Sequence, residues 1–263
     1  IVGLQQPIRL SHMAHMVRQI QSLPALPETV HRVREAMLSP DSSVTSVTDI
    51  ITLDPPVAAK VLSVANSAAY GFTHKITDLT LAVSLMGLKE TYAIVLSAAV
   101  VDLLSQMEEF DYRTFWLESV CSACASRIVA KVSGRRQLPG VFTAGLLHDI
   151  GRAALWDVAP QKCKRIDSSL SGLALLEAEQ SIVGLTHVEA GYELARHWAL
   201  PDEIAQSIRF HHHPELAPSS REHVAIVALS DAMVQASGSR LEDNPAVFDG
   251  YQSSLELLGL DME

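Results

Sequence analysis

Apolar residues recur at the period of an α-helix along most of the chain, and no convincing segment alternates at the two-residue period of a β-strand. Pro27 stands where a first helical residue would, and apolar residues follow every three or four positions until Ser39-Pro40 ends the helix. Ser43 and Asp78 are expected to cap two further helices. The pattern therefore predicts an all-α fold.

The second half of the chain follows the same period. Further helices are expected at residues 112–132, at residues 141–156, and between Pro201 and Pro214. Two Ser/Thr-x-x-Glu capping boxes mark other helix starts, namely Thr186 with Glu189 and Ser219 with Glu222. Residues from about Ser237 onward are expected to be irregular or to form a weak final helix.

An acidic and aromatic stretch at residues 108–112 marks the expected boundary between two subdomains. We expect an N-terminal helical bundle that packs on a C-terminal helical subdomain. The predicted divisions are an extension at residues 1–22, the N-terminal subdomain at 23–107, the C-terminal subdomain at 112–236, and a tail at 237–263. Because the sequence begins with Ile1 rather than Met, we expect it to be part of a longer protein.

Composition and charge narrow the functional classes. The chain has 20 Lys and Arg against 30 Asp and Glu, a net charge of -10, which disfavours nucleic acid as a partner because phosphate contacts need a basic face. The richest apolar run, residues 93–101, is under half of the roughly 20 residues that a bilayer requires, and no signal peptide is evident. We expect a cytoplasmic protein with no membrane partner.

The three cysteines, Cys121, Cys124 and Cys163, are expected to be reduced thiols, which is usual for a cytoplasmic protein. Cys121 and Cys124 form a Cys-x-x-Cys pair within a predicted helix, without the second pair that a structural zinc site needs. We therefore expect them to be buried and to pack like small apolar groups.

The sequence also places ionisable residues on the apolar faces of its predicted helices. An ionised carboxylate without a partner is too costly to bury, so each such residue needs a counter-charge, a hydrogen-bond network or a metal ion. Mixed imidazole and carboxylate ligands suit divalent Fe, Mn, Zn, Ni or Co. The candidate ligands are Glu118, His148, Asp149, His187, His211, His212 and Asp231.

A simpler interpretation stays open for each residue alone. A single inward histidine is usually a hydrogen-bonded core residue, and Asp231 could pair with His148 across a helix interface without any metal. The adjacent pairs His148-Asp149 and His211-His212 favour a shared polar site. We expect either a divalent transition metal at this site or no cofactor.

Nine segments between about residues 23 and 236 are informative as a set: Leu23-Pro-Ala-Leu-Pro27, Asp54-Pro-Pro-Val-Ala-Ala-Lys-Val-Leu62, Ala65-Asn-Ser-Ala-Ala-Tyr-Gly71, Ala82 through Gly87-Leu88, Phe115-Trp116, Ala144-Gly-Leu-Leu-His-Asp-Ile-Gly151, His187 to Gly191, His211-His212-His213-Pro214, and Leu229-Ser-Asp231. In these segments the chain resembles the HDOD family, a relative of the HD and HD-GYP phosphohydrolases. No single short motif carries the resemblance, and this breadth makes it specific.

The resemblance implies roles for the candidate ligands. His148 and Asp149 correspond to the pair that names the HD enzymes, and the last four candidates fall where HD-GYP enzymes place further metal ligands. Arg152 stands where those enzymes have a lysine, and its guanidinium could hold an anion. Glu118 replaces the first histidine of the HD set. Residues 214–218 replace the glycine-tyrosine-proline segment of the cyclic-dinucleotide hydrolases, so hydrolysis of cyclic di-GMP is disfavoured.

Two functions follow from the resemblance, and a sensor that binds a nucleotide or a metal without turnover is a third possibility. The first is a bacterial signalling output module that acts through contacts with other signalling domains or proteins. The second is a metal-dependent phosphohydrolase, in which Asp149 positions the reacting groups and Arg152 stabilises phosphate charge. We favour the non-catalytic module. Long apolar helices at the subdomain boundary are also compatible with a homodimer.

Overall fold

The computed structural model describes residues 5–67, 73–104, 110–136, 138–236 and 245–260; the side chains of residues 5–12, 104 and 245–251 are outside this description. These residues contain helices and no strand, as the periodicity predicts. The chain divides into two compact units, Pro24–Gln106 and Ile1–Leu23 with Met107–Glu263. Among the described helices, none is by itself long and apolar enough to cross a bilayer; only the pair Leu79–Met86 and Leu88–Leu103, bent by 112°, passes that test together.

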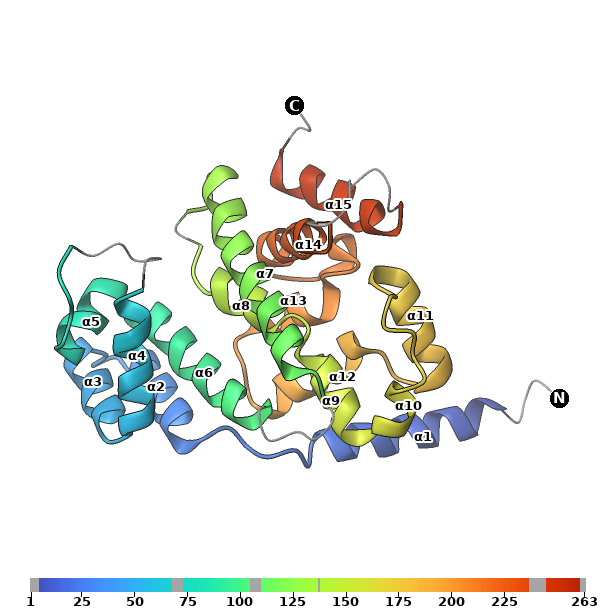
Figure 1. Ribbon diagram of the computed structural model, residues 1–263, viewed down its shortest axis with the longest axis horizontal. Helices are drawn as coiled ribbons and strands as arrows, with labels where there is room; N and C mark the ends of the chain where they lie inside the picture. The colour runs from blue at the N-terminus through green and yellow to red at the C-terminus, as the bar shows by residue number, and fades with distance from the viewer. Residues whose placement is uncertain (1–4, 68–72, 105–109, 137, 237–244, 261–263) are drawn as a thin grey trace. The chain divides into compact units, whose positions relative to one another are not determined.

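The Pro24–Gln106 unit is a helical bundle (Figure 1). Its helices are α2 (Glu28–Leu38), α3 (Val44–Thr52), α4 (Pro55–Ala65), α5 (Leu79–Met86) and α6 (Leu88–Leu104). Ser43 caps α3 as predicted, in a reciprocal box with Ser46, and the carboxylate of Asp78 accepts the amide of Leu81 at the start of α5. The sequence pattern also predicts that a helix breaks near Tyr70-Gly71, and these two residues lie outside the described residues.

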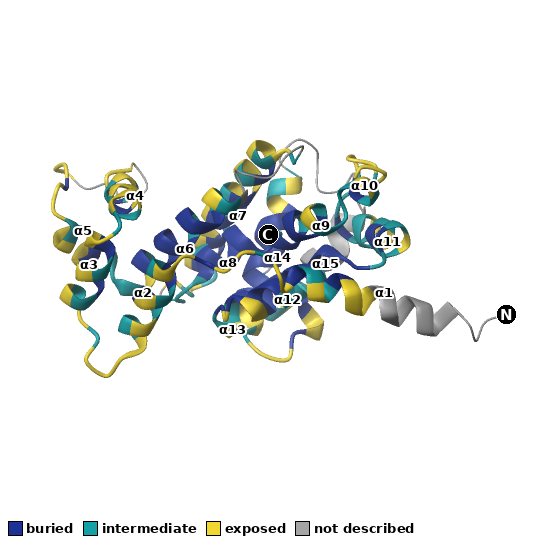
Figure 2. Cartoon of the chain, turned by 90° about the horizontal axis from the view of Figure 1, so that it is seen from below, coloured by how far each residue is buried: buried dark blue, intermediate teal, exposed yellow. Residues whose placement is uncertain are grey.

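The larger unit carries the remaining helices. They are α1 (Gln5–Ile20), α7 (Tyr112–Val132), α8 (Val141–Leu147), α9 (Ile150–Val158), α10 (Pro160–Cys163), α11 (Gly172–Ile182), α12 (His187–His197), α13 (Asp202–Phe210), the 3-10 turn η1 (Pro214–Leu216), α14 (Arg221–Gln235) and α15 (Pro245–Leu258). Helix α14 packs against α7, α8, α13 and α15, and it is buried along most of its length (Figure 2). It is therefore the central helix of this unit.

Both ends of the chain contribute helices to this unit. Met16 and Ile20 of α1 are buried, and α1 contacts α9 and α12. Leu258 of α15 belongs to an apolar cluster with Ile226 and Leu229 of α14. The segment after Ser237, for which the sequence favours irregular structure or a weak helix, thus includes a helix that packs on the core.

The structure corrects the prediction of one helix over residues 141–156. The helix stops at Leu147 and a new one begins at Ile150, with His148 and Asp149 forming a tight turn between them. In a continuous helix two adjacent side chains point about 100° apart. The turn instead allows both side chains to reach the same side of the unit.

The capping box predicted at Ser219 is also wrong. Helix α14 begins after Ser220, whose φ of 53° is left-handed and whose side chain makes no capping hydrogen bond. The hydroxyl of Ser219 donates to Asp202 instead, at 2.8 Å, and Glu222 pairs with Arg135. The box predicted at Thr186 and Glu189 is present.

Two of the three cysteines are exposed, although the sequence predicts that they are buried. Cys121 and Cys124 are exposed on α7, so they do not pack as core residues, whereas Cys163 is buried. None of the three forms a disulfide.

Helices α9 and α12 cross at two glycines. A β-carbon at Gly151 would lie 1.8 Å from the carbonyl oxygen of His187 and 2.5 Å from the amide nitrogen of Gly191. A β-carbon at Gly191 would lie 2.6 Å from Cγ2 of Ile208. Only glycine permits this backbone approach. The crossing brings the first turn of α12 against the turn that holds Asp149.

Candidate metal centre

His187 is the first residue of α12 and is completely buried. The Thr186–Glu189 capping box fixes this helix start. Oε2 of Glu179, on α11, accepts both the backbone amide and Nδ1 of His187, each at 2.8 Å. With its Nδ1 proton donated to that carboxylate, His187 presents the lone pair of Nε2 to the interior.

His211 and His212 come from the end of α13. Nδ1 of His211 donates to the carbonyl oxygens of Ser207 and Ile208, both at 3.1 Å. The His211 side chain is buried, and its Nε2 is 3.4 Å from Oδ1 of Asp149. Nε2 of His212 lies 3.2 Å from Nε2 of His187. Two histidines from one helix end thus face the first turn of α12.

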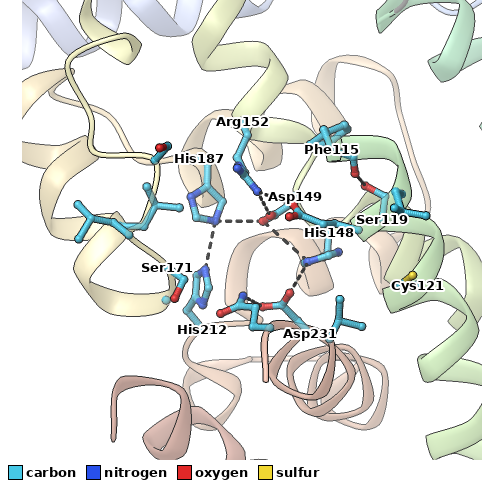
Figure 3. Close-up of a pocket in the computed structure, with 18 of the residues that line it drawn as sticks. Phe115, Ser119, Cys121, His148, Asp149, Arg152, Ser171, His187, His212 and Asp231 are labelled. Atoms are coloured by element: carbon cyan, nitrogen blue, oxygen red, sulfur yellow. Dashed lines mark hydrogen bonds and ion pairs between the residues drawn. The ribbon is translucent and has the colours of Figure 1, made fainter. Parts of the chain in front are cut away.

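His148 and Asp231 form the opposite side of the cluster (Figure 3). Nδ1 of His148 donates to the carbonyl oxygen of Gly145 at 2.8 Å, which again leaves Nε2 as the inward atom. Oδ1 of Asp231, on α14, is 3.2 Å from that Nε2. Oδ2 of Asp231 accepts the side-chain amide of Gln235 one turn later. Gln235 therefore holds the carboxylate in place.

Asp149 lies between the two sides (Figure 3). Its Oδ1 is 3.3 Å from Nε2 of His187 and 3.9 Å from Nε2 of His148. Two overlapping ligand groups result, in each of which the ligand atoms all lie within 4.8 Å of one another: Asp149, His187, His211 and His212, and then His148, His211 and Asp231. Six of the seven ligands predicted from the sequence are thus brought together.

The seventh predicted ligand, Glu118, lies outside both groups. Its side chain is 52% exposed on α7, and Oε2 lies 3.4 Å from Nη1 of Arg152. The same guanidinium nitrogen is 3.2 Å from Oδ2 of Asp149. Arg152 therefore links Glu118 to the cluster, and Glu118 contacts a cation rather than the imidazoles.

The residues present fit a metal ion. Among the described residues, Nε2 of His148 and Nε2 of His211 are buried without a hydrogen-bond partner of acceptable geometry, although carboxylate oxygens lie close to both. Buried polar atoms are rarely left unsatisfied, so such a pair requires explanation. Imidazole nitrogens and carboxylate oxygens that converge on one point form a donor set for a divalent transition metal.

Without a metal the cluster distributes protons unevenly. Burial lowers the pKa of His148, but the charges of Asp149 and Asp231 outweigh it and raise the value to about 9. Burial likewise opposes a charge on His187, yet Glu179 and Asp149 raise its pKa. Burial and the neighbouring imidazoles hold the pKa of His212 well below its ordinary value. A metal ion that binds through Nε2 therefore competes with a proton at His148 and at His187.

Glu179 is the important residue that the sequence reasoning missed. It is a carboxylate at 3% exposure on α11, where it holds His187. A signal was available, because Glu179 follows Leu175 by four residues and so lies on the same helical face. No helix is predicted over this segment, so Glu179 is absent from the predicted site residues.

A cavity of about 510 Å³ opens onto the cluster. His148, Asp149, His187, His212 and Asp231 all line it. Arg152 lines it beside them. The arrangement can hold a cation on its imidazole side and an anion on its guanidinium side, both facing one space.

The fold and the site together define an all-helical protein with a buried histidine-aspartate cluster. The sequence model of the HDOD domain matches residues 23–214, and the chain belongs to this family. An uncharacterized protein of Treponema pallidum is 24% identical over 209 residues, which make up 77% of this chain. The match covers only 40% of that relative.

Solved structures share the fold. An HDOD domain protein of unknown function from Geobacter sulfurreducens is 24% identical, with a TM-score of 0.72 over 96% of this chain and 97% of that one. A candidate phosphohydrolase from Shewanella amazonensis is 23% identical, with a TM-score of 0.71 over 94% of this chain and 89% of that one. At this identity the likeness extends to the fold alone.

Proposed function

We propose that the chain is an HDOD module whose cluster holds a divalent transition metal and acts on a phosphate ester. One observation carries this proposal: the buried Nε2 atoms of His148 and His211, which make no hydrogen bond of acceptable geometry, converge on the carboxylate oxygens of Asp231 and Asp149 at the wall of a cavity. When bound, such an ion supplies Lewis-acid chemistry, which polarises a phosphoryl oxygen and activates water.

The protein's own groups have distinct parts in this function. The ligand set would be Asp149, His187, His211 and His212, with His148 and Asp231 beside it. Glu179 and the backbone carbonyls fix the tautomers of the histidines. Arg152 positions the phosphate through its guanidinium, which is always charged.

Metal analysis tests the proposal directly. The purified chain, reconstituted with Mn²⁺ or Fe²⁺ and desalted, should retain the metal, and a screen of generic phosphate esters should detect hydrolysis. Asp149→Ala should abolish both. Asp157→Ala, which removes an exposed aspartate from the same helix α9, is the matched control and should change neither. A folded wild-type protein that holds no metal and turns over no ester contradicts the proposal.

The Pro24–Gln106 unit supports a second function, signalling through contacts with other signalling domains or proteins. Large apolar side chains are exposed on this unit: Leu38 at 73%, Leu53 at 71%, Leu81 at 48% and Leu85 at 50%. Leu81 and Leu85 share one face of α5. Exposed apolar residues that share a face are typical of protein contacts.

Paired charge substitutions test this second function. Leu81→Glu with Leu85→Glu should abolish co-purification with a signalling partner from the source cells while leaving metal retention intact. Thr80→Glu with Ser84→Glu changes exposed polar residues of the same helix and is the control. Equal recovery of the partner with both pairs contradicts the proposal.

A further inference from the structure

A second cavity adjoins the first. It measures about 370 Å³, and six residues line both cavities: Phe115, Glu118, Arg152, Ser168, Leu170 and Leu175. The Glu118–Arg152 ion pair therefore lies where the two spaces meet. Only the larger cavity is lined by the imidazoles of the cluster.

The smaller cavity has an aromatic wall. The ring centroid of Phe110 is 5.3 Å from that of Phe115 and 5.8 Å from that of Trp156, in tilted arrangements. Nε1 of Trp156 is buried and has no hydrogen-bond partner among the described residues. Aromatic faces with one spare N–H donor suit an uncharged planar group.

The charges of the two cavities oppose a highly charged ligand. Among the described lining residues, Arg152 is the one guanidinium, and no lysine lines either cavity. Six carboxylates accompany it: Asp111, Glu118, Asp149, Asp167, Glu179 and Asp231. Even with a divalent ion bound in the cluster, the negative charges of these carboxylates outnumber the positive charges of the ion and Arg152. Each additional negative charge on a ligand therefore adds repulsion.

Glu118 places a negative charge beside Arg152, where the phosphate of a ligand would bind. It contacts the same Nη1 of Arg152 that contacts Asp149, so a phosphate that approaches this nitrogen meets both carboxylates. The pair is partly exposed, at 38% for Arg152 and 52% for Glu118, and such ion pairs are weak enough for a ligand to displace. Because α7 keeps Glu118 at the junction, the carboxylate stays close after displacement.

We propose that the site selects singly charged phosphodiesters over doubly charged phosphomonoesters, and that Glu118 is the residue that determines this selection. The inference rests on the proposed function, because it requires a phosphate ester at the metal site. A diester carries two substituents on its phosphorus, and two cavities meet at Arg152 to receive them. A monoester fills only one cavity and brings a second negative charge beside Glu118.

Calorimetry of the Mn²⁺-loaded chain at pH 8 tests this proposal, with diphenyl phosphate and phenyl phosphate as probes. Wild-type protein should bind the diester about tenfold more tightly than the monoester. Glu118→Gln keeps the size of the side chain and removes its charge. It should tighten phenyl phosphate binding about tenfold and diphenyl phosphate binding by only about threefold. Glu177→Gln, an exposed carboxylate on α11 that lines neither cavity, is the matched control and should leave both affinities unchanged.

The ratio of the two affinities is compared between wild type and Glu118→Gln. Because the probes are the same for both proteins, a change in this ratio reports the charge of Glu118 and not the different sizes of the probes. Mn²⁺ retention with no preference for the diester, or with the same ratio in wild type and Glu118→Gln, overturns this inference and leaves the proposed function standing. A wild-type chain that retains no Mn²⁺ overturns both.

Discussion

Glu179 determines the position and the tautomer of the His187 imidazole. Its Oε2 accepts both the backbone amide and Nδ1 of His187, so helix position and imidazole tautomer are fixed by the same atom. A ligand held in this way loses little freedom on metal binding, and its second nitrogen gains basicity.

We therefore expect Glu179→Gln to weaken metal binding without removing any ligand. Loss of the charged partner should lower Mn²⁺ affinity by about 10- to 100-fold, as measured by calorimetry. Glu177→Gln, on the exposed side of the same helix, should leave the affinity unchanged. Equal affinities for wild type and Glu179→Gln would show that His187 is not oriented through this contact.

The reactivity of Cys163 tests whether its side chain is buried beside the second cavity. Burial, with the charge of Glu179 behind it, raises the pKa of the Cys163 thiol to about 11. A raised thiol pKa keeps the reactive thiolate scarce until the pH approaches that value. Alkylation at pH 8, mapped by mass spectrometry, should label the exposed Cys121 and Cys124 first, and Cys163 should react at least about tenfold more slowly. Labelling of all three at one rate would contradict this burial.

At the scale of elements, the crossing of α9 and α12 sets the geometry of the cluster. Gly151 and Gly191 allow the two backbones to approach until a β-carbon would overlap a carbonyl oxygen. The tight turn before α9 then directs Asp149 toward the first residue of α12. Two small residues thus position ligands that lie far apart in the sequence.

Gly151→Ala should separate these helices. The new methyl group meets the backbone at His187, which cannot move aside as a side chain can, so the free energy of unfolding should fall by about 2–3 kcal/mol. Gly191→Ala meets chiefly the Ile208 side chain and should cost less. Chemical denaturation checks the order, and metal affinity should fall more in Gly151→Ala. The reverse order would contradict this account of the crossing.

At the scale of the whole molecule, the candidate metal site belongs to one compact unit only. Every ligand lies within the Met107–Glu263 part of the larger unit, and the Pro24–Gln106 unit supplies none of them. Ligand binding to the native state stabilises the part of the fold that contains the site.

Hydrogen exchange with and without Mn²⁺ should therefore separate the two units. Amides of α12, α13 and the middle of α14 should exchange at least about tenfold more slowly with the metal, because local opening then releases a bound ion. Amides of α3 and α4 should be unchanged. Equal protection of both units would show that metal binding also stabilises the Pro24–Gln106 unit, and would contradict this prediction.

The sequence alone determined the helical class and most of the polar cluster. Helical periodicity is local, so it can be followed without knowing any contact, and six ionisable residues on apolar faces were identified because burying each of them is costly. The capping box at Thr186 was equally local, and it is present.

Only the tertiary structure decided how those residues meet. The break at His148-Asp149 and the role of Ser219 depend on neighbours distant in sequence, which override local preference. Glu118 satisfied the helical pattern yet contacts Arg152, because a periodic face does not specify what lies opposite it. Glu179 is absent from the predicted site because no helix is predicted over its segment, and its contact with His187, eight residues later, depends on the turn between α11 and α12.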